Sequence, residues 1–220
     1  MKIKLVFLFL ILFIYCKSNS NKSEILKNRN FRTPLNTVFQ NNSCSFLKSN
    51  LLQDPDNIDF LEFRYTCSKD KNYNPNYSNS KTREELFQLL DESKYDKVLI
   101  KLNEFFKADY SEITAHLIAT IIYGKKEKEE LVNFHNKVAR GLINSILQSG
   151  DGSIQNPFFV ISVKEEYNFL DAMNVRIEER LPSKYLDDEI IDIFAIEDNK
   201  NKTKMKVHFI LINVKELYKR

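Results

Sequence analysis

The sequence lacks the short motifs that identify the commonest enzyme classes. It contains no Gly-x-Ser-x-Gly, no Walker phosphate loop, no Rossmann glycine fingerprint and no His-Glu-x-x-His. Cysteine and histidine are scarce, at three residues each, and there is no Cys-x-x-Cys. These absences argue against a resident metal or cofactor and against the commonest enzymes, but they leave enzymes in general open.

The first residues carry an export signal. Lysines precede an apolar run over residues 5–15, which is short for a membrane span and typical of a secretory signal peptide, residues 1–15. Cys16 follows directly, as in bacterial lipoproteins whose cysteine takes up lipid, palmitate included, and becomes the new N-terminus. Such signals usually have a small residue where this chain has Tyr15, so ordinary cleavage after Ser20 and a retained anchor stay open as alternatives.

The charge balance argues against a nucleic-acid partner. The formal net charge is +3, and it falls to +1 when the two lysines of residues 1–15 are removed. Basic residues gather in residues 16–34, a Ser- and Asn-rich stretch that reads as a disordered tether. Beside a lipid, this tether would be drawn to anionic headgroups. The expected partners are therefore the membrane, through the N-terminal lipid, and an unidentified protein or small molecule.

If Cys16 is lipidated, Cys44 and Cys67 are the two thiols that remain. An even number of thiols in an exported chain favours a disulfide between them. Two separate buried thiols remain the alternative, because the sequence alone does not fix connectivity.

We expect a single α+β domain over residues 35–220. Residues 35–80 are irregular, with one strand at 60–67 where aromatic residues alternate. Residues 82–148 form amphipathic helices joined by short loops, hence helical hairpins. Residues 157–213 form a small, mostly antiparallel sheet with one short helix at 163–173.

Within the predicted sheet, residues 188–196 and 205–213 should form a hairpin across the polar turn 198–203. Both faces of the segment 190–196 are largely apolar, which predicts an inner strand covered by helices. Asp192 would then lie near His208 if the register allowed.

Two histidines are candidates for chemistry. His116 and His135 lie on consecutive predicted helices and would approach each other if these pack antiparallel. Flanked by Glu112 or Glu129, they could act as acid and base or bind zinc. Helical histidines in an amphipathic pattern are more often packing residues that are hydrogen-bonded inside the fold.

The turn Gly150-Asp151-Gly152 follows the last long helix, and Gly150 is well placed to end it in the left-handed conformation. Asp151 can bind neighbouring amides in a structural turn, or hold calcium together with Ser153 and nearby carbonyls. The segment lacks the alternating acids of an EF-hand loop, which favours the structural reading.

Several short segments resemble one bacterial family. They are the Ser-Gly-Asp-Gly turn at 149–152 with its following strand, residues 162–170, residues 134–146, and the aromatic-proline loop at 73–77. Together they resemble the family called domain of unknown function 4919, over residues 56–213. The resemblance implies an exported bacterial protein without an assigned activity, and it implies no catalytic residues.

The sequence therefore predicts a bacterial envelope lipoprotein with a soluble binding or scaffold domain. One alternative is an exported enzyme, for example a hydrolase, using His116 and His135. Another is a freely secreted factor, if Cys16 is not lipidated.

Overall fold

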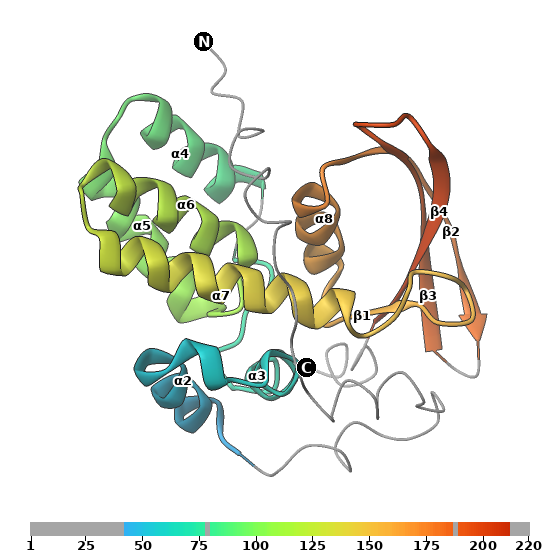
Figure 1. Ribbon diagram of the computed structural model, residues 1–220, viewed down its shortest axis with the longest axis horizontal. Helices are drawn as coiled ribbons and strands as arrows, with labels where there is room; N and C mark the ends of the chain where they lie inside the picture. Colours follow the sequence, from blue (N-terminus) through green and yellow to red (C-terminus); the bar gives the residue numbers. More distant parts are fainter. Residues whose placement is uncertain (1–41, 78–79, 187–188, 212–220) are drawn as a thin grey trace. The chain divides into compact units, whose positions relative to one another are not determined.

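The computed structural model describes residues 42–77, 80–186 and 189–211 (Figure 1). Within this part of the chain, residues 42–142 and residues 143–211 form two compact units, and each is described by itself. The chain combines helices with a four-stranded sheet, which confirms the predicted α+β class. Residues 1–34, including Cys16 and the expected tether, lie outside the described residues.

The first unit is helical. Its elements are α2 (Cys44–Gln53), the short 3-10 helix η4 (Pro55–Asn57), α3 (Phe60–Cys67), α4 (Ser80–Asp91), α5 (Tyr95–Ala108), α6 (Ile113–Lys125) and the first part of α7 (Glu129–Leu147). Apolar residues recur at helical spacing in α5, where Val98, Leu102 and Phe105 are buried. Helix α5 packs against both α4 and α6, so the predicted helical hairpins are present.

Residues 60–67 form helix α3, so the predicted strand is wrong. Asp59 explains the difference, because its carboxylate accepts the backbone N–H groups of Leu61 and Glu62 at 3.1 Å each and caps the helix. The five consecutive residues 61–65 are all buried. The alternation of aromatic residues in this segment therefore does not mark the buried and exposed faces of a strand. Burial on every side, together with the cap, favours the helix.

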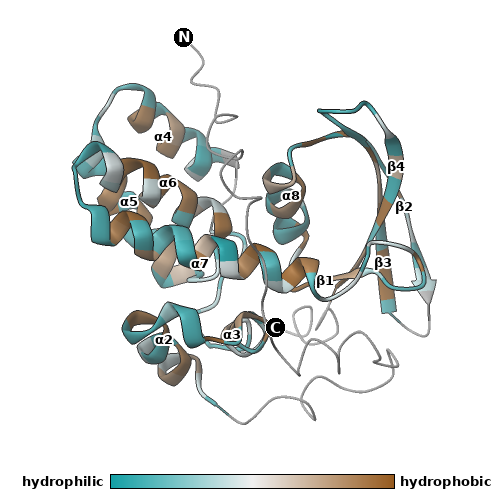
Figure 2. Cartoon of the chain, in the orientation of Figure 1, coloured by the Kyte–Doolittle hydropathy of each residue, from teal (hydrophilic) through white to brown (hydrophobic). Residues whose placement is uncertain are grey.

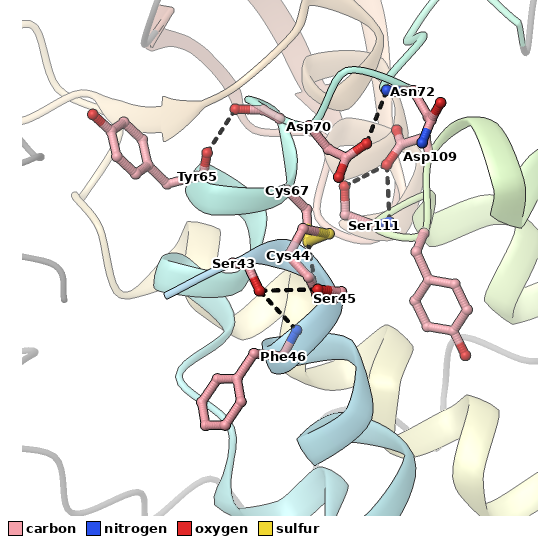
Figure 3. The surroundings of a disulfide bond; sticks show 12 residues. Ser43, Cys44, Ser45, Phe46, Tyr65, Cys67, Asp70, Asn72, Asp109 and Ser111 are labelled. Atoms are coloured by element: carbon pink, nitrogen blue, oxygen red, sulfur yellow. Dashed lines mark hydrogen bonds between the residues drawn. A yellow bond between two sulfur atoms is a disulfide. The ribbon is translucent and has the colours of Figure 1, made fainter. Parts of the chain in front are cut away.

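A disulfide joins α2 to α3. Cys44 and Cys67 are bonded at 2.04 Å, as expected from the even number of thiols (Figure 3). The same view shows Ser43, whose hydroxyl accepts the N–H of Phe46 and caps α2. The bond ties together two short helices that are 23 residues apart in sequence at the bonded cysteines.

The second unit contains the sheet. Its elements are β1 (Phe158–Val160), α8 (Val163–Ala172), β2 (Val175–Leu186), β3 (Glu189–Asp198) and β4 (Lys204–Leu211), with strand order β1-β4-β3-β2. Strands β3 and β4 form the predicted antiparallel hairpin, and β3 is an inner strand as expected. Strand β1 is parallel to β4, with Phe158 opposite Phe209.

One face of the sheet packs on α8 through aromatic side chains. Phe169 of α8 lies 5.9 Å from Phe209, and Tyr167 lies 5.4 Å from Phe194, measured between ring centroids. Strand β4 changes from exposed and hydrophilic at its start to buried and hydrophobic at its end (Figure 2). The apolar core of this unit therefore lies between α8 and the strand segments nearest Phe194 and Phe209.

Strand β2 forms one edge of the sheet and has two register shifts, one between Ile177 and Glu179 and one between Leu181 and Lys184. The second shift contains Pro182, which has no N–H to donate to a neighbouring strand. Bulges and proline are the usual means of protecting an edge strand from pairing with another chain.

Candidate functional site

The two candidate histidines meet inside the helical unit. Nδ1 of His116 on α6 lies 2.9 Å from Nδ1 of His135 on α7. Nε2 of His116 lies 2.9 Å from the backbone carbonyl oxygen of Tyr110. His116 is fully buried, and His135 is 7% exposed. Helical spacing thus predicted correctly that the two rings approach each other.

These hydrogen bonds fix the tautomers. A carbonyl only accepts, so Nε2 of His116 carries the proton, and Nδ1 of neutral His116 is then an acceptor. Nδ1 of His135 must therefore donate, which leaves Nε2 of His135 as an unprotonated nitrogen. Neither Glu112 nor Glu129 takes part in the hydrogen bonds of these two rings within the described residues.

Aromatic rings surround the pair and keep it neutral. The His135 ring stacks with Phe106, at 5.7 Å, and with Tyr123, at 5.4 Å, measured between ring centroids. Burial, followed by the neighbouring His135, lowers the pKa of His116 to about 3, and burial lowers the pKa of His135 to about 4. Burial also raises the pKa of Tyr110 to about 12. At neutral pH this cluster is uncharged.

Asp151 lies in a turn closed by its own backbone. Its carboxylate accepts the N–H of Ser153 at 2.8 Å, and the N–H groups of Asp151 and Gly152 donate to the carbonyl of Asn156. The hydrogen bond from Ser153 lowers the pKa of Asp151. The arrangement is a structural turn, and among the described residues no group of three or more His, Cys, Asp or Glu could hold a metal ion.

The left-handed residue in this turn is Gly152, with φ of 76°, and the expectation that Gly150 has this conformation is wrong. Gly150 is required for a different reason, because a Cβ there would lie 2.3 Å from the carbonyl oxygen of Pro157.

His208 binds this turn and does not face Asp192. Its backbone N–H and its Nδ1 both lie 3.0 Å from the carbonyl oxygen of Gly152. Across the hairpin, His208 is opposite Ile193, whereas Asp192 is opposite Phe209. Neighbouring residues of a strand point to opposite faces, so the suggested pair of His208 with Asp192 is wrong.

A buried carboxyl group that the sequence did not single out lies between α8 and the sheet. Glu166 is completely buried, and neither of its carboxylate oxygens has a hydrogen-bond partner among the described residues. Burial, followed by the negative charge of Asp192, raises the pKa of Glu166 to about 9. Asp192 itself accepts a hydrogen bond from Arg180 Nη2 at 2.8 Å and another from the hydroxyl of Ser183.

A signal for Glu166 was present in the sequence. Glu166 precedes Phe169 and Leu170 by three and four residues, which places its side chain on the apolar face of the predicted helix. Acidic residues in the first turn of a helix are common because they interact favourably with its dipole, so the pattern did not single out Glu166 as a buried group.

Among the described residues, no helix is both long and apolar enough to cross a membrane. The model of the family "Domain of unknown function (DUF4919)" matches residues 51–220 of the chain. A search of curated proteins and a search of solved structures found no match.

Proposed function

We propose that this chain, which belongs to the DUF4919 family, is an exported lipoprotein of the bacterial cell envelope that serves as a binding or scaffold module. The observation that carries the proposal is the disulfide between Cys44 and Cys67. Disulfides form and persist in oxidising compartments and are rare in the cytosol, so the bond supports export. The apolar run over residues 5–15 and Cys16 form the matching export signal in the sequence.

Lipid at Cys16 would hold the protein at the membrane. A single acyl chain binds membranes only marginally, and stable anchoring takes a second signal. Full lipoprotein modification supplies further chains, and the basic residues between 17 and 34 add attraction to anionic headgroups. The folded part would then act at the membrane surface on a protein or small molecule.

The test is metabolic labelling with radioactive palmitate. The wild-type protein should take up label, and Cys16→Ala should abolish it and leave an unprocessed precursor or a soluble product. Cys44→Ser is the matched control, since it removes a different cysteine and should keep the label. An unlabelled wild-type protein whose mature N-terminus is Asn21 would replace the lipoprotein with a freely secreted factor.

The state of Cys44 and Cys67 tests export separately. Thiol alkylation of the protein as isolated from cells should modify neither residue, whereas alkylation after reduction should modify both. If both thiols react without reduction, the disulfide does not form in the cell and the main support for export is lost.

One observation favours the second candidate, an exported enzyme using His116 and His135. The tautomers leave Nε2 of His135 unprotonated, which is the form that a general base needs. A panel of hydrolase substrates tests it. Activity that is lost in His135→Gln but kept in His208→Gln would favour the enzyme.

A further inference from the structure

Glu166 is in an environment that does not suit a carboxylate ion. Its side chain is completely buried, and no donor among the described residues reaches either oxygen. An ionised carboxylate in such a place is costly unless it is paired and hydrogen-bonded. Buried polar groups without a partner are rare in native proteins and call for a proton, a water or an ion.

The charged groups around Glu166 come from each element that packs on it. Asp192 on β3 faces it, and Arg180 on β2 lies beyond, bound to Asp192. Glu165, its neighbour on α8, instead accepts the backbone N–H of Ile161 at 2.8 Å. From β1 and β4, Phe158 and Phe209 contact Phe169 of α8 through apolar rings. Two carboxyl groups therefore share one nearby guanidinium.

We propose that Glu166 and Asp192 bind one proton between them at neutral pH, and that this shared proton fastens the bulged end of edge strand β2 to β3. The Glu166 carboxyl group donates its proton to the Asp192 carboxylate. Asp192 then accepts from three donors, namely Glu166, Arg180 and Ser183. Arg180 precedes the register shift between Leu181 and Lys184 and Ser183 lies within it, so Asp192 holds β2 on both sides of Pro182.

The electrostatics agree with this arrangement. Burial and the charge of Asp192 both favour neutral Glu166, and only Arg180 acts in the opposite direction. If Glu166 lost its proton, two adjacent negative charges would compete for one arginine. The segment 180–185 of β2 would then lose part of its attachment.

Infrared spectroscopy of the intact protein tests where the proton is. The wild-type protein at pH 7 should show the carbonyl band of one buried protonated carboxyl group, and the band should disappear as the pH rises past about 9. Glu166→Gln should remove the band, and the matched control Glu165→Gln should keep it. Absence of the band from the wild-type protein at pH 7, or its persistence in Glu166→Gln, would overturn the proposal.

Hydrogen exchange tests the attachment of β2. Glu166→Gln keeps a donor for Asp192, so the backbone amides of residues 180, 181 and 183–185 should stay as protected as in the wild-type protein. Asp192→Asn loses charge-assisted hydrogen bonds, and we expect these amides to exchange about tenfold faster or more. Equal exchange in wild type and Asp192→Asn would show that the pair does not hold the strand.

A cation in place of the proton is a separate outcome. Magnesium or calcium chloride at millimolar concentration should leave the infrared band unchanged if the site holds a proton. Loss of the band on adding either salt, in both the wild-type protein and Glu165→Gln, would identify a cation site and overturn the shared proton. None of these results depends on lipid at Cys16.

Discussion

Both units bury titratable side chains without ionising them, but they do so with opposite chemistry. The helical unit contains His116 and His135, bases whose pKa values are lowered by burial to about 3 and about 4. The sheet unit contains Glu166, an acid whose pKa is raised by burial and by Asp192 to about 9. Burial disfavours the charged form in each case, so the base gives up a proton and the acid keeps one.

Because of this difference, lowering the pH and raising the pH should destabilise different units of the same chain. The histidines satisfy each other and the Tyr110 carbonyl, and aromatic rings close around them. Glu166 has an acidic neighbour whose other partners come from an edge strand. Acidification therefore acts against the helical unit and alkalinisation against the sheet unit.

The disulfide should give the largest difference between the units. Changing Cys44 and Cys67 together to Ser should destabilise the helical unit by about 3 kcal/mol, because the unfolded chain regains the freedom of an open loop. The sheet unit, with no disulfide among its described residues, should keep its stability. Hydrogen exchange followed peptide by peptide at pH 7 measures each unit. Equal loss in both would show that they unfold together and would break the comparison.

Acid should affect the helical unit next. The pKa values of His116 and His135 lie below the unfolded value of 6.5, so the unfolded chain takes up protons first as the pH falls. Their contribution is complete above pH 6.5 and is lost progressively toward pH 4 and below. Going from pH 7.5 to 5.5 should cost about 2 to 3 kcal/mol for the two residues together.

Chemical denaturation at a series of pH values, read through peptides of α6 and α7, gives this dependence. Replacing both histidines by Gln should flatten it, and His208→Gln should leave it unchanged. A steep dependence that survives in the double variant would assign acid sensitivity to other groups.

Rising pH should have the opposite effect on the sheet unit. The pKa of Glu166 lies above its unfolded value of 4.5, so the native state holds a proton that the unfolded state releases. Stability is fullest below pH 4.5 and falls as the pH rises toward about 9. The loss is at most about 1.4 kcal/mol per pH unit, since one group is involved. The same denaturation series, read through peptides of β2 and β3, should be flat in Glu166→Gln.

The smallest expected effect compares one helix cap from each unit. Ser43 caps α2 by accepting the N–H of Phe46, and Ser162 caps α8 by accepting the N–H of Glu165. Replacing either serine by Ala should cost about 1 kcal/mol. Exchange should increase only in the unit that contains the change, and an effect on the other unit would show coupling between them.

The sequence predicted elements whose signals are local. Apolar spacing along α5, α6 and α7 and short connections gave the helical hairpins, and the polar turn between two apolar runs gave the hairpin of β3 and β4. Residues 60–67 were assigned wrongly because alternation looked like a half-buried strand, whereas the segment is buried all round and capped by Asp59.

The candidate sites, like the elements, were predictable only where their signal is local in the sequence. His116 and His135 lie on consecutive helices, so their approach could be predicted from spacing alone. Glu166 and Asp192 meet because α8 packs on β3, and no local pattern records that packing or the register that places Asp192 opposite Phe209. Helical spacing places Glu166 on the apolar face of α8, but it does not reveal that Asp192 is its neighbour in the sheet.

The parallel pairing of β1 with β4 has a consequence for the order of events during synthesis. Phe158 is paired with Phe209, and β4 lies between β1 and β3, so the strand made last among those described is an inner one. A growing chain cannot close this sheet until β4 has emerged, and until then β1 lacks its neighbour and β3 presents an open edge. Such long-range pairing is slow to form. The hairpins of the helical unit involve neighbouring segments, so a nascent chain can complete them earlier.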